Sequence, residues 1–110
     1  MSDDRRTIIV VARTLHHPAA ESLELTGVLH ALADPVRLEI VRALASGGEC
    51  RCGAFELPVT KSTRTHHFRV LRESGVIEQR AEGTALVNRL RRDELDERFP
   101  GLVHSVLSAR

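Results

Sequence analysis

The change of hydrophobic period near residue 76 is the feature that most constrains the fold of this chain. Before it, apolar residues recur at the three- and four-residue spacing of amphipathic helices. Beyond it, residues 76–80 and 84–90 are typical of two short strands, joined by a tight turn at residues 81–83 in which Gly83 supplies the positive φ. Helices followed by one hairpin predict a mostly α fold with a small β-hairpin (α+β).

Four helical segments are expected before the hairpin. Residues 18–33 carry the apolar stripe of the first segment. Asp34 followed by Pro35 begins the second, because the aspartate accepts hydrogen bonds from free backbone N–H groups and proline lacks the N–H that would have no partner there. A short third segment is expected around residues 50–57, and Thr60 caps a fourth that ends just before the hairpin.

A last helical region follows the hairpin. Residues 93–98 form a helical turn or two, and residues 102–107 form an amphipathic helix. The order α-α-α-α-β-β-α, with helix, short helix, turn, helix and hairpin in succession, is that of a winged helix-turn-helix. The 110 residues fit one such domain at 18–110, preceded by an N-terminal arm at 1–17. We expect the helices at both ends of the domain to pair in a homodimer.

Basic residues are concentrated in one stretch of the chain. The net charge is only +1, but residues 61–92 hold eight Lys or Arg and three Glu, a local excess of five positive charges. A basic segment on a near-neutral domain indicates one face that contacts phosphates. With no Trp, no Tyr and three Phe, the chain lacks an aromatic platform for stacking single-stranded bases, so double-stranded DNA is the expected partner.

Other classes of protein are excluded by what the sequence lacks. No apolar run approaches the roughly 20 residues of a membrane span, which argues against a membrane partner. No set of nucleophile, base and acid and no phosphate-cradling glycine loop indicates an enzyme. Cys50 and Cys52 are too close in sequence to pair with each other, which favours a reducing, cytoplasmic location.

The segment after Thr60 has the two faces of a DNA-recognition helix. Placing Phe68 and Leu71 inward leaves a polar face for the major groove. Serine, threonine and histidine hydrogen-bond base edges, whereas lysine and arginine reach guanines or phosphates. That face carries Lys61, Ser62, Thr65, His66, Arg69 and Arg72. His67 lies toward the core, where we expect it to be packed or capping rather than a ligand.

Three segments resemble the ArsR/SmtB family of winged helix-turn-helix repressors. They are residues 31–41 (ALADPVRLEIV), residues 61–77, which match the recognition helix, and residues 80–84, which match the wing tip. The resemblance implies a sequence-specific transcriptional repressor that binds a palindromic operator as a homodimer. The DNA contacts expected on these segments are Lys61, Ser62, Thr63, Arg64, Thr65, His66, Arg69, Arg80 and Thr84.

Arg64 departs from the family pattern, in which this position is usually apolar and faces the core. One interpretation is that the side chain extends beside the helix to reach a phosphate. The other is that it loosens the helix and weakens DNA binding. Together with the near-neutral charge, the second interpretation motivates an alternative function, a winged-helix interaction subunit that needs a co-regulator protein to bind DNA.

Cys50 and Cys52 resemble the Cys-x-Cys of the thiolate metal site in the same family. The third thiolate of the arsenic-type site would fall at Phe55, so His16 and His17 are the candidates to complete a mixed cysteine–histidine site for zinc, nickel or cobalt. The simpler alternative is that the cysteines are small, partly buried residues and the histidines belong to a loop. A thiol redox sensor at the cysteine pair is a further hypothesis.

Overall fold

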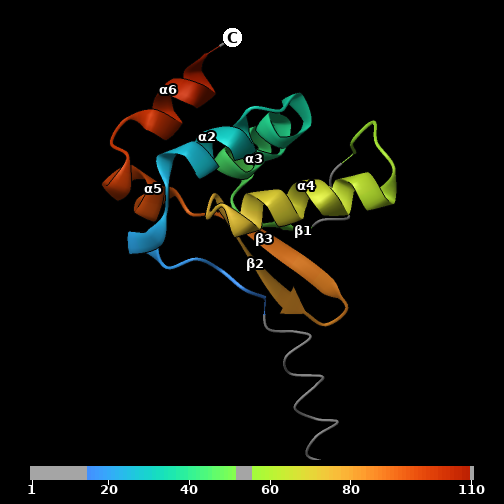
Figure 1. The fold of residues 1–110 in the computed structure, drawn as a ribbon. Helices are drawn as coiled ribbons and strands as arrows, with labels where there is room; N and C mark the ends of the chain where they lie inside the picture. The colour runs from blue at the N-terminus through green and yellow to red at the C-terminus, as the bar shows by residue number, and fades with distance from the viewer. Residues whose placement is uncertain (1–14, 52–55, 110) are drawn as a thin grey trace, which may run out of the picture.

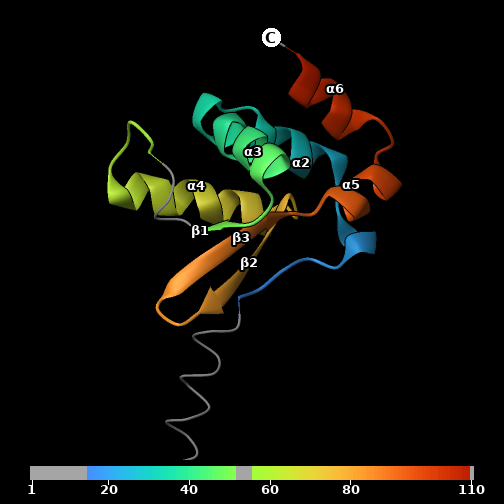
Figure 2. The same cartoon turned by 180° about the vertical axis from the view of Figure 1, so that it is seen from behind.

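The computed structural model describes residues 15–51 and 56–109, in which a helical body carries one projecting hairpin (Figure 1). The elements are η1 (Ala20–Ser22), α2 (Leu25–Leu32), α3 (Pro35–Gly47), β1 (Cys50–Arg51), α4 (Lys61–Glu73), β2 (Ile77–Glu82), β3 (Ala85–Leu90), α5 (Arg92–Arg98) and α6 (Leu102–Ser108). Seen from behind, β2 and β3 extend away from the helices as a wing (Figure 2). The expected mostly α fold with a small hairpin is confirmed. None of the described helices has the length and apolar character needed to cross a membrane.

Local sequence explains where α3 and α4 begin. Asp34 Oδ1 accepts hydrogen bonds from the N–H groups of Val36 at 2.8 Å and Arg37 at 3.1 Å. These bonds, chiefly the one from Arg37, hold the pKa of the Asp34 carboxyl below its ordinary value. Thr60 Oγ1 accepts from the N–H of Thr63 at 3.2 Å. Both predicted caps are confirmed, and each typically stabilises its helix by about 1 kcal/mol.

The sheet has three antiparallel strands in the order β1–β3–β2. Asn88 on β3 is the common point of the register, because it pairs with Cys50 of β1 on one side and with Gln79 of β2 on the other. Gly83, with φ of 64°, lies in the turn between β2 and β3 and provides the left-handed backbone conformation expected there.

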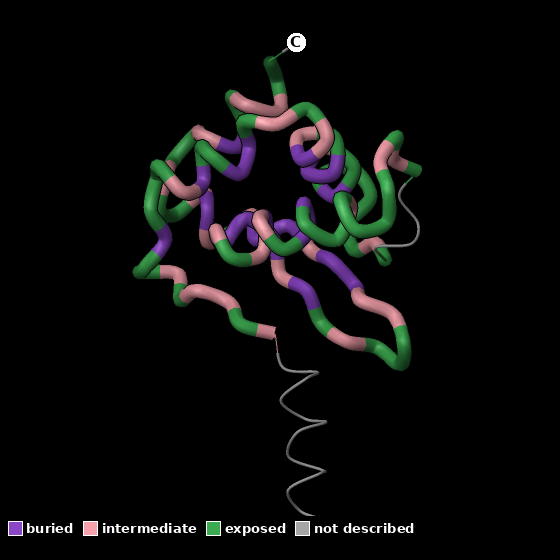
Figure 3. The backbone as a smooth tube through the Cα atoms, turned by 45° about the vertical axis from the view of Figure 1, so that its right-hand side comes forward, coloured by how far each residue is buried: buried purple, intermediate pink, exposed green. Residues whose placement is uncertain are grey.

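The core lies between the helices and the base of the sheet, where the buried stretches of the chain gather (Figure 3). Helix α4 contributes Phe68 and Leu71 to it, each at most 2% exposed. This burial fixes the rotation of α4 about its axis, so its opposite face is turned to solvent. The core residues are Leu23, Val28, Ala31, Leu32, Ile40, Val41, Leu44, Phe68, Leu71, Val76, Ile77, Leu90, Leu95 and Val103.

Three expectations about element boundaries need correction. The region 18–33 is not one helix, because η1 ends before the buried Leu23 and α2 begins only at Leu25. In the segment 50–57, the first two residues form β1 instead of a helix, since they pair with β3, and residues 52–55 lie outside the described part. The hairpin turn falls at residues 83–84 instead of 81–83, because the ladder extends to Glu82. The expected arm at 1–17 is described only from residue 15.

Candidate nucleic-acid interface

Helix α4 presents a continuous polar face to solvent. Its inward face is buried through His67, Phe68 and Leu71. The outward side chains predicted to contact DNA are exposed, namely Lys61, Ser62, Thr63, Thr65, His66 and Arg69. The structure therefore places six of the seven candidate residues on this helix in solvent, and the seventh, Arg64, is half-buried.

Hydrogen bonds within α4 restrict what some of these groups can offer to DNA. The Thr65 hydroxyl donates to the carbonyl oxygen of Lys61 at 3.0 Å, so its remaining capacity is that of an acceptor. The Thr63 hydroxyl accepts from the Thr60 hydroxyl at 3.0 Å in the cap of the helix. His66 is exposed, and its ring is tilted against that of His67 with centroids 5.9 Å apart.

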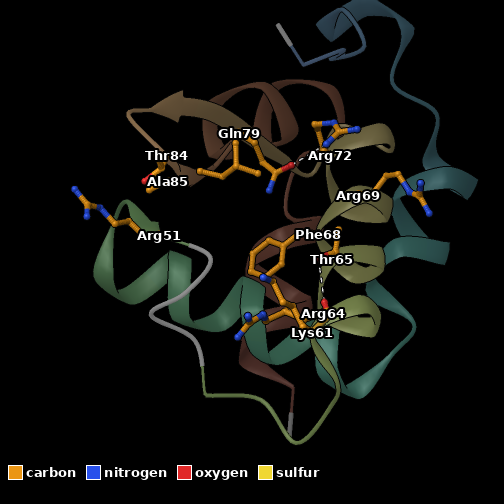
Figure 4. Close-up of a pocket in the computed structure, with 11 residues that line it drawn as sticks. Arg51, Lys61, Arg64, Thr65, Phe68, Arg69, Arg72, Gln79, Thr84 and Ala85 are labelled. Atoms are coloured by element: carbon orange, nitrogen blue, oxygen red, sulfur yellow. Dashed lines mark hydrogen bonds between the residues drawn. The ribbon is translucent and has the colours of Figure 1, made fainter. Parts of the chain in front are cut away.

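Arg64 lies in a groove between α4 and the wing. It lines this groove together with Phe68 of α4 and Ala85 of β3 (Figure 4). Arg64 makes no ion pair with any described residue, and its half-buried side chain lines the groove beside the helix. This geometry agrees with the first interpretation of Arg64, in which the side chain extends outward, and α4 is continuous through it.

The wing carries Arg80 and Thr84, but Arg80 is already paired. Its guanidinium donates to both carboxylate oxygens of Glu49, at 2.7 and 2.9 Å, and to Glu82 at 3.3 Å. The hydrogen bond with Arg80 lowers the pKa of Glu49, and Glu49 in turn raises the pKa of Arg80 above its ordinary value. Thr84 is exposed at the wing tip. Glu49 and Glu82 therefore compete with a DNA phosphate for the Arg80 guanidinium.

Substituting Glu49 by glutamine is expected to strengthen DNA binding at low salt, because a neutral side chain competes less strongly than a carboxylate for the Arg80 guanidinium. The slope of log affinity against log salt should become steeper by about one unit, as expected for one additional phosphate contact. Fluorescence anisotropy on one duplex over a salt series measures both quantities. Glu97→Gln is the matched control. Glu97 is exposed on α5, so this substitution removes the same charge far from the wing. Equal changes in both variants would show that net charge, and not Arg80, is responsible.

A buried arginine attaches α4 to the helices behind it. Arg37, 7% exposed, donates through Nε to the carbonyl of Ala31 at 2.7 Å and through Nη2 to that of His30 at 3.2 Å. Its Nη1 lies 3.1 Å from His67 Nδ1, which must be the acceptor because arginine has only donors. The expectation that His67 lies toward the core is confirmed, since it is 7% exposed. Arg37 was missed, although it precedes Ile40, Val41 and Leu44 at the i, i+3, i+4, i+7 spacing of the buried stripe.

A second buried chain of hydrogen bonds joins α4 to the sheet. Arg72 donates to Gln79 Oε1 at 2.9 Å, Gln79 Nε2 donates to Asn88 Oδ1 at 2.7 Å, and Asn88 Nδ2 donates to the carbonyl of Cys50 at 3.1 Å. Gln79 and Asn88 are 3% and 0% exposed. Period-two alternation with Ile77 could have indicated that Gln79 faces inward. These hydrogen bonds fix the angle between the wing and α4. Simultaneous contact of both elements with a DNA duplex depends on this angle.

Comparison with known proteins identifies this arrangement. A helix-turn-helix domain model matches residues 32–80. The chain is 33% identical over 82 residues to the HTH-type transcriptional regulator YceK of Bacillus subtilis, covering 72% of this chain and 82% of that protein. It is 32% identical over 74 residues to the arsenical resistance operon repressor of Staphylococcus xylosus, covering 66% of this chain and 71% of the repressor. This chain belongs to the ArsR family of helix-turn-helix transcriptional regulators.

Solved structures agree with this assignment. A crystal structure of an ArsR family transcriptional regulator superposes with a TM-score of 0.61 at 20% identity, over 86% of this chain and 99% of that one, which shows the shared fold. A possible transcriptional regulator for arsenical resistance gives a TM-score of 0.59 at 30% identity, over 74% and 84% of the two chains. Membership in an ArsR family of DNA-binding regulators also agrees with the exclusion of an enzyme.

The described geometry of this ArsR family member does not assemble the mixed cysteine–histidine site. His17 Nε2 accepts a hydrogen bond from the N–H of Gln79 at 3.0 Å, and burial lowers the pKa of His17, so the ring is held neutral against β2. Cys50 lies on β1, at the other edge of the sheet, roughly 10 Å from β2 at two strand spacings. His16 is exposed, and Cys52 lies outside the described residues. Within the described part, no three or more His, Cys, Asp or Glu side chains cluster as a metal site.

Proposed function

We propose that this ArsR family regulator is a repressor that binds a palindromic, double-stranded operator as a homodimer. The observation that carries the proposal is the exposed polar face of α4, backed by buried Phe68 and Leu71, beside a projecting wing. A helix of this kind enters the major groove, and the wing follows the adjacent backbone. The relative in Staphylococcus xylosus is named as a repressor, which supports the same role here.

The proposed contacts divide by chemistry. Ser62, Thr65 and His66 hydrogen-bond base edges, while the basic side chains approach guanines or phosphates. Thr63 and Thr84 contact the backbone through their hydroxyl groups. The basic contacts are Lys61, Arg64, Arg69 and Arg80. We assign all of them to the winged helix-turn-helix domain at residues 18–110, with the arm at 1–17 outside the interface.

The homodimer rests on an apolar face at the end of the molecule opposite the wing (Figure 1). Leu25 and Leu29, one turn apart on α2, are 46% and 42% exposed, and they are the large hydrophobic residues left in solvent among those described. On α6, Leu102, Val106 and Leu107 are only partly buried. Pairing these helices across a two-fold axis removes this apolar surface from water and places the two copies of α4 one DNA turn apart.

Selection of bound DNA from a random pool tests the repressor proposal. We expect inverted repeats whose half-sites are centred about 10 base pairs apart, as one helical turn requires. Light scattering should give twice the chain mass of 12.2 kDa, and replacing Leu25 and Leu29 by glutamate should give the single chain mass and abolish operator binding. A monomeric wild-type protein that enriches no DNA sequence at low salt would instead favour the interaction subunit that needs a co-regulator.

For the effector, the Cys50-x-Cys52 pair favours a thiophilic metal ion, and a relative named for arsenical resistance supports this class. His17 does not fit such a site, because its ring accepts a hydrogen bond from Gln79 at the opposite edge of the sheet. The proposal therefore keeps the two thiolates and the exposed His16 as candidate ligands, without His17. Zinc, nickel and cobalt remain the ions to test.

Cobalt titration separates these ligand sets. A thiolate ligand gives a charge-transfer absorption in the near ultraviolet, which we expect in the wild type and expect to be lost in Cys50→Ser/Cys52→Ser. His17→Ala should leave the band unchanged, since its ring faces β2. A wild-type protein without the band contradicts the thiolate site. A weakened band in His17→Ala would instead support the mixed cysteine–histidine site. His17 would then have to give up its hydrogen bond with Gln79 when the metal binds.

A further inference from the structure

The groove between α4 and the wing has the size and lining of a small-molecule site. Its volume is about 520 Å³, within the range of about 300–1,000 Å³ typical of ligand pockets. Phe68, Ala85 and Leu86 provide apolar lining, and Phe68 is packed with only 2% of its surface exposed. Thr65 and Gln79 add polar groups at its sides. In Figure 4 the Phe68 ring lies centrally, between α4 and the side that carries Arg51.

The charged lining of this groove has a single sign. Its cationic side chains are Arg51, Lys61, Arg64, Arg69 and Arg72, and no acidic residue is among the described lining residues. Arg51 approaches Glu82 only at 3.8 Å in solvent, and Arg72 is bound to Gln79. Lys61, Arg64 and Arg69 have no ion-pair partner among the residues that the structure describes. Lys61 and Arg64 line the groove from the same helix as Phe68 (Figure 4).

We propose that this groove binds a small organic anion, a carboxylate carried on an apolar body of about two fused rings, and that the bound anion excludes DNA. The apolar body gains by covering Ala85 and Leu86, which are only half-buried, and a hydrated inorganic ion would not do so. The carboxylate matches the planar fork of Arg64, which binds such groups through two parallel hydrogen bonds. Charge complementarity selects the acid over its neutral analogue.

Competition with DNA follows from the position of the groove. Lys61, Arg64, Thr65 and Arg69 line it and also belong to the face of α4 assigned to DNA, so the inference rests on the proposed function. A ligand that binds only the DNA-free protein weakens the apparent DNA affinity by a factor of one plus the ratio of ligand concentration to Kd. At ten times Kd this factor is about 11 for each protomer. The anion would act by direct occlusion of the interface.

Isothermal titration of 2-naphthoate into the full-length chain, without DNA, tests the groove. We expect saturable binding with one site per chain, binding of 2-naphthamide at least tenfold weaker, and no binding of acetate. Arg64→Gln should weaken 2-naphthoate binding about tenfold, through the lost charge-assisted bonds. Ala85→Phe should abolish it by filling the groove. Arg92→Gln, on α5 outside the groove, is the matched control and should bind as the wild type does.

Operator displacement completes the test and separates the two proposals. If the protein binds its operator but 2-naphthoate does not saturate it, or binds Arg64→Gln and Ala85→Phe undiminished, the groove inference is overturned and the repressor proposal stands. If 2-naphthoate binds the groove but no DNA sequence is enriched, the site stands and the DNA-binding proposal fails. If 2-naphthoate and operator bind together without mutual weakening, occlusion is wrong.

Discussion

Gly75→Ala is expected to destabilise the fold by about 3 kcal/mol, from backbone strain and overpacking together. Gly75 joins α4 to β2 with φ of 87°, a left-handed conformation that costs an alanine about 1–2 kcal/mol. Its added Cβ would overlap Leu23 Cδ2 and lie 3.3 Å from Leu23 Cγ and from Pro18 Cγ. Because Leu23 is 1% exposed in the core, it can move away from the added Cβ only by giving up part of its core packing. Overpacking of this kind typically adds about 1–3 kcal/mol.

Gly101→Ala separates the two contributions to this loss. Gly101 has φ of 81°, but no atom lies within 4 Å of the position of an added Cβ, so only the backbone strain remains. Urea unfolding followed by circular dichroism measures both variants. We expect the midpoint of Gly75→Ala to fall well below that of Gly101→Ala. Equal midpoints would mean that Leu23 can move away from an alanine, and that its packing against α4 is looser than the structure shows.

The parts of the fold set by neighbouring residues were the predictable ones. Asp34 with Pro35, and Thr60 before a polar–apolar stripe, determine the starts of α3 and α4 through hydrogen bonds that reach only two or three residues along the chain. The hairpin is similarly local, since a period-two pattern and Gly83 define it. These elements also position the polar face of α4, which is why the candidate DNA contacts could be assigned in advance.

The parts set by contacts distant in sequence were missed. Strand β1 is two residues long and exists because Cys50 and Arg51 find β3, 36 to 38 positions later. Glu49 pairs with Arg80, which is 31 positions later in the chain, so the Arg80 side chain expected to contact a phosphate already has a partner. The groove between α4 and the wing combines lining from four separate elements, α4 and the three strands. Residue spacing along one helix or strand carries no information about contacts between different elements.

Residues buried with polar partners form a second class that pattern reasoning underestimates. Arg37 and the Gln79–Asn88 pair occupy core-facing positions that hydrophobic patterns assign to apolar side chains. Arg37 is stable there because its Nε, Nη1 and Nη2 atoms each donate to an acceptor on α2 or α4. These hydrogen bonds also bear on function. Those of Arg37 attach α4 to the helical body, and those of Gln79 and Asn88 attach the wing to α4.

Loss of the Thr65 hydroxyl is expected to remove sequence preference at one position of each half-site. The Thr65 hydroxyl hydrogen is committed to the Lys61 carbonyl, so Thr65 can only accept, and it should select the amino group of adenine or cytosine in the major groove. One such contact is worth about 1–3 kcal/mol, and a homodimer makes it twice. Thr65→Val should therefore weaken operator binding by about 2–6 kcal/mol while leaving binding to unrelated DNA unchanged. His66→Ala should act similarly at a neighbouring base.

Thr65→Ser is the matched control, because serine keeps the acceptor that valine lacks and loses only a methyl group. Competition anisotropy with operators carrying each base at each half-site position gives the preference of every variant. We expect Thr65→Ser to retain the adenine or cytosine preference, and Thr65→Val to treat all four bases nearly alike. If both variants lose affinity uniformly across sequences, Thr65 contacts the backbone and the readout lies elsewhere on α4. If His66→Ala leaves every preference intact while Arg80→Ala changes one, the roles assigned to the recognition helix and the wing are reversed.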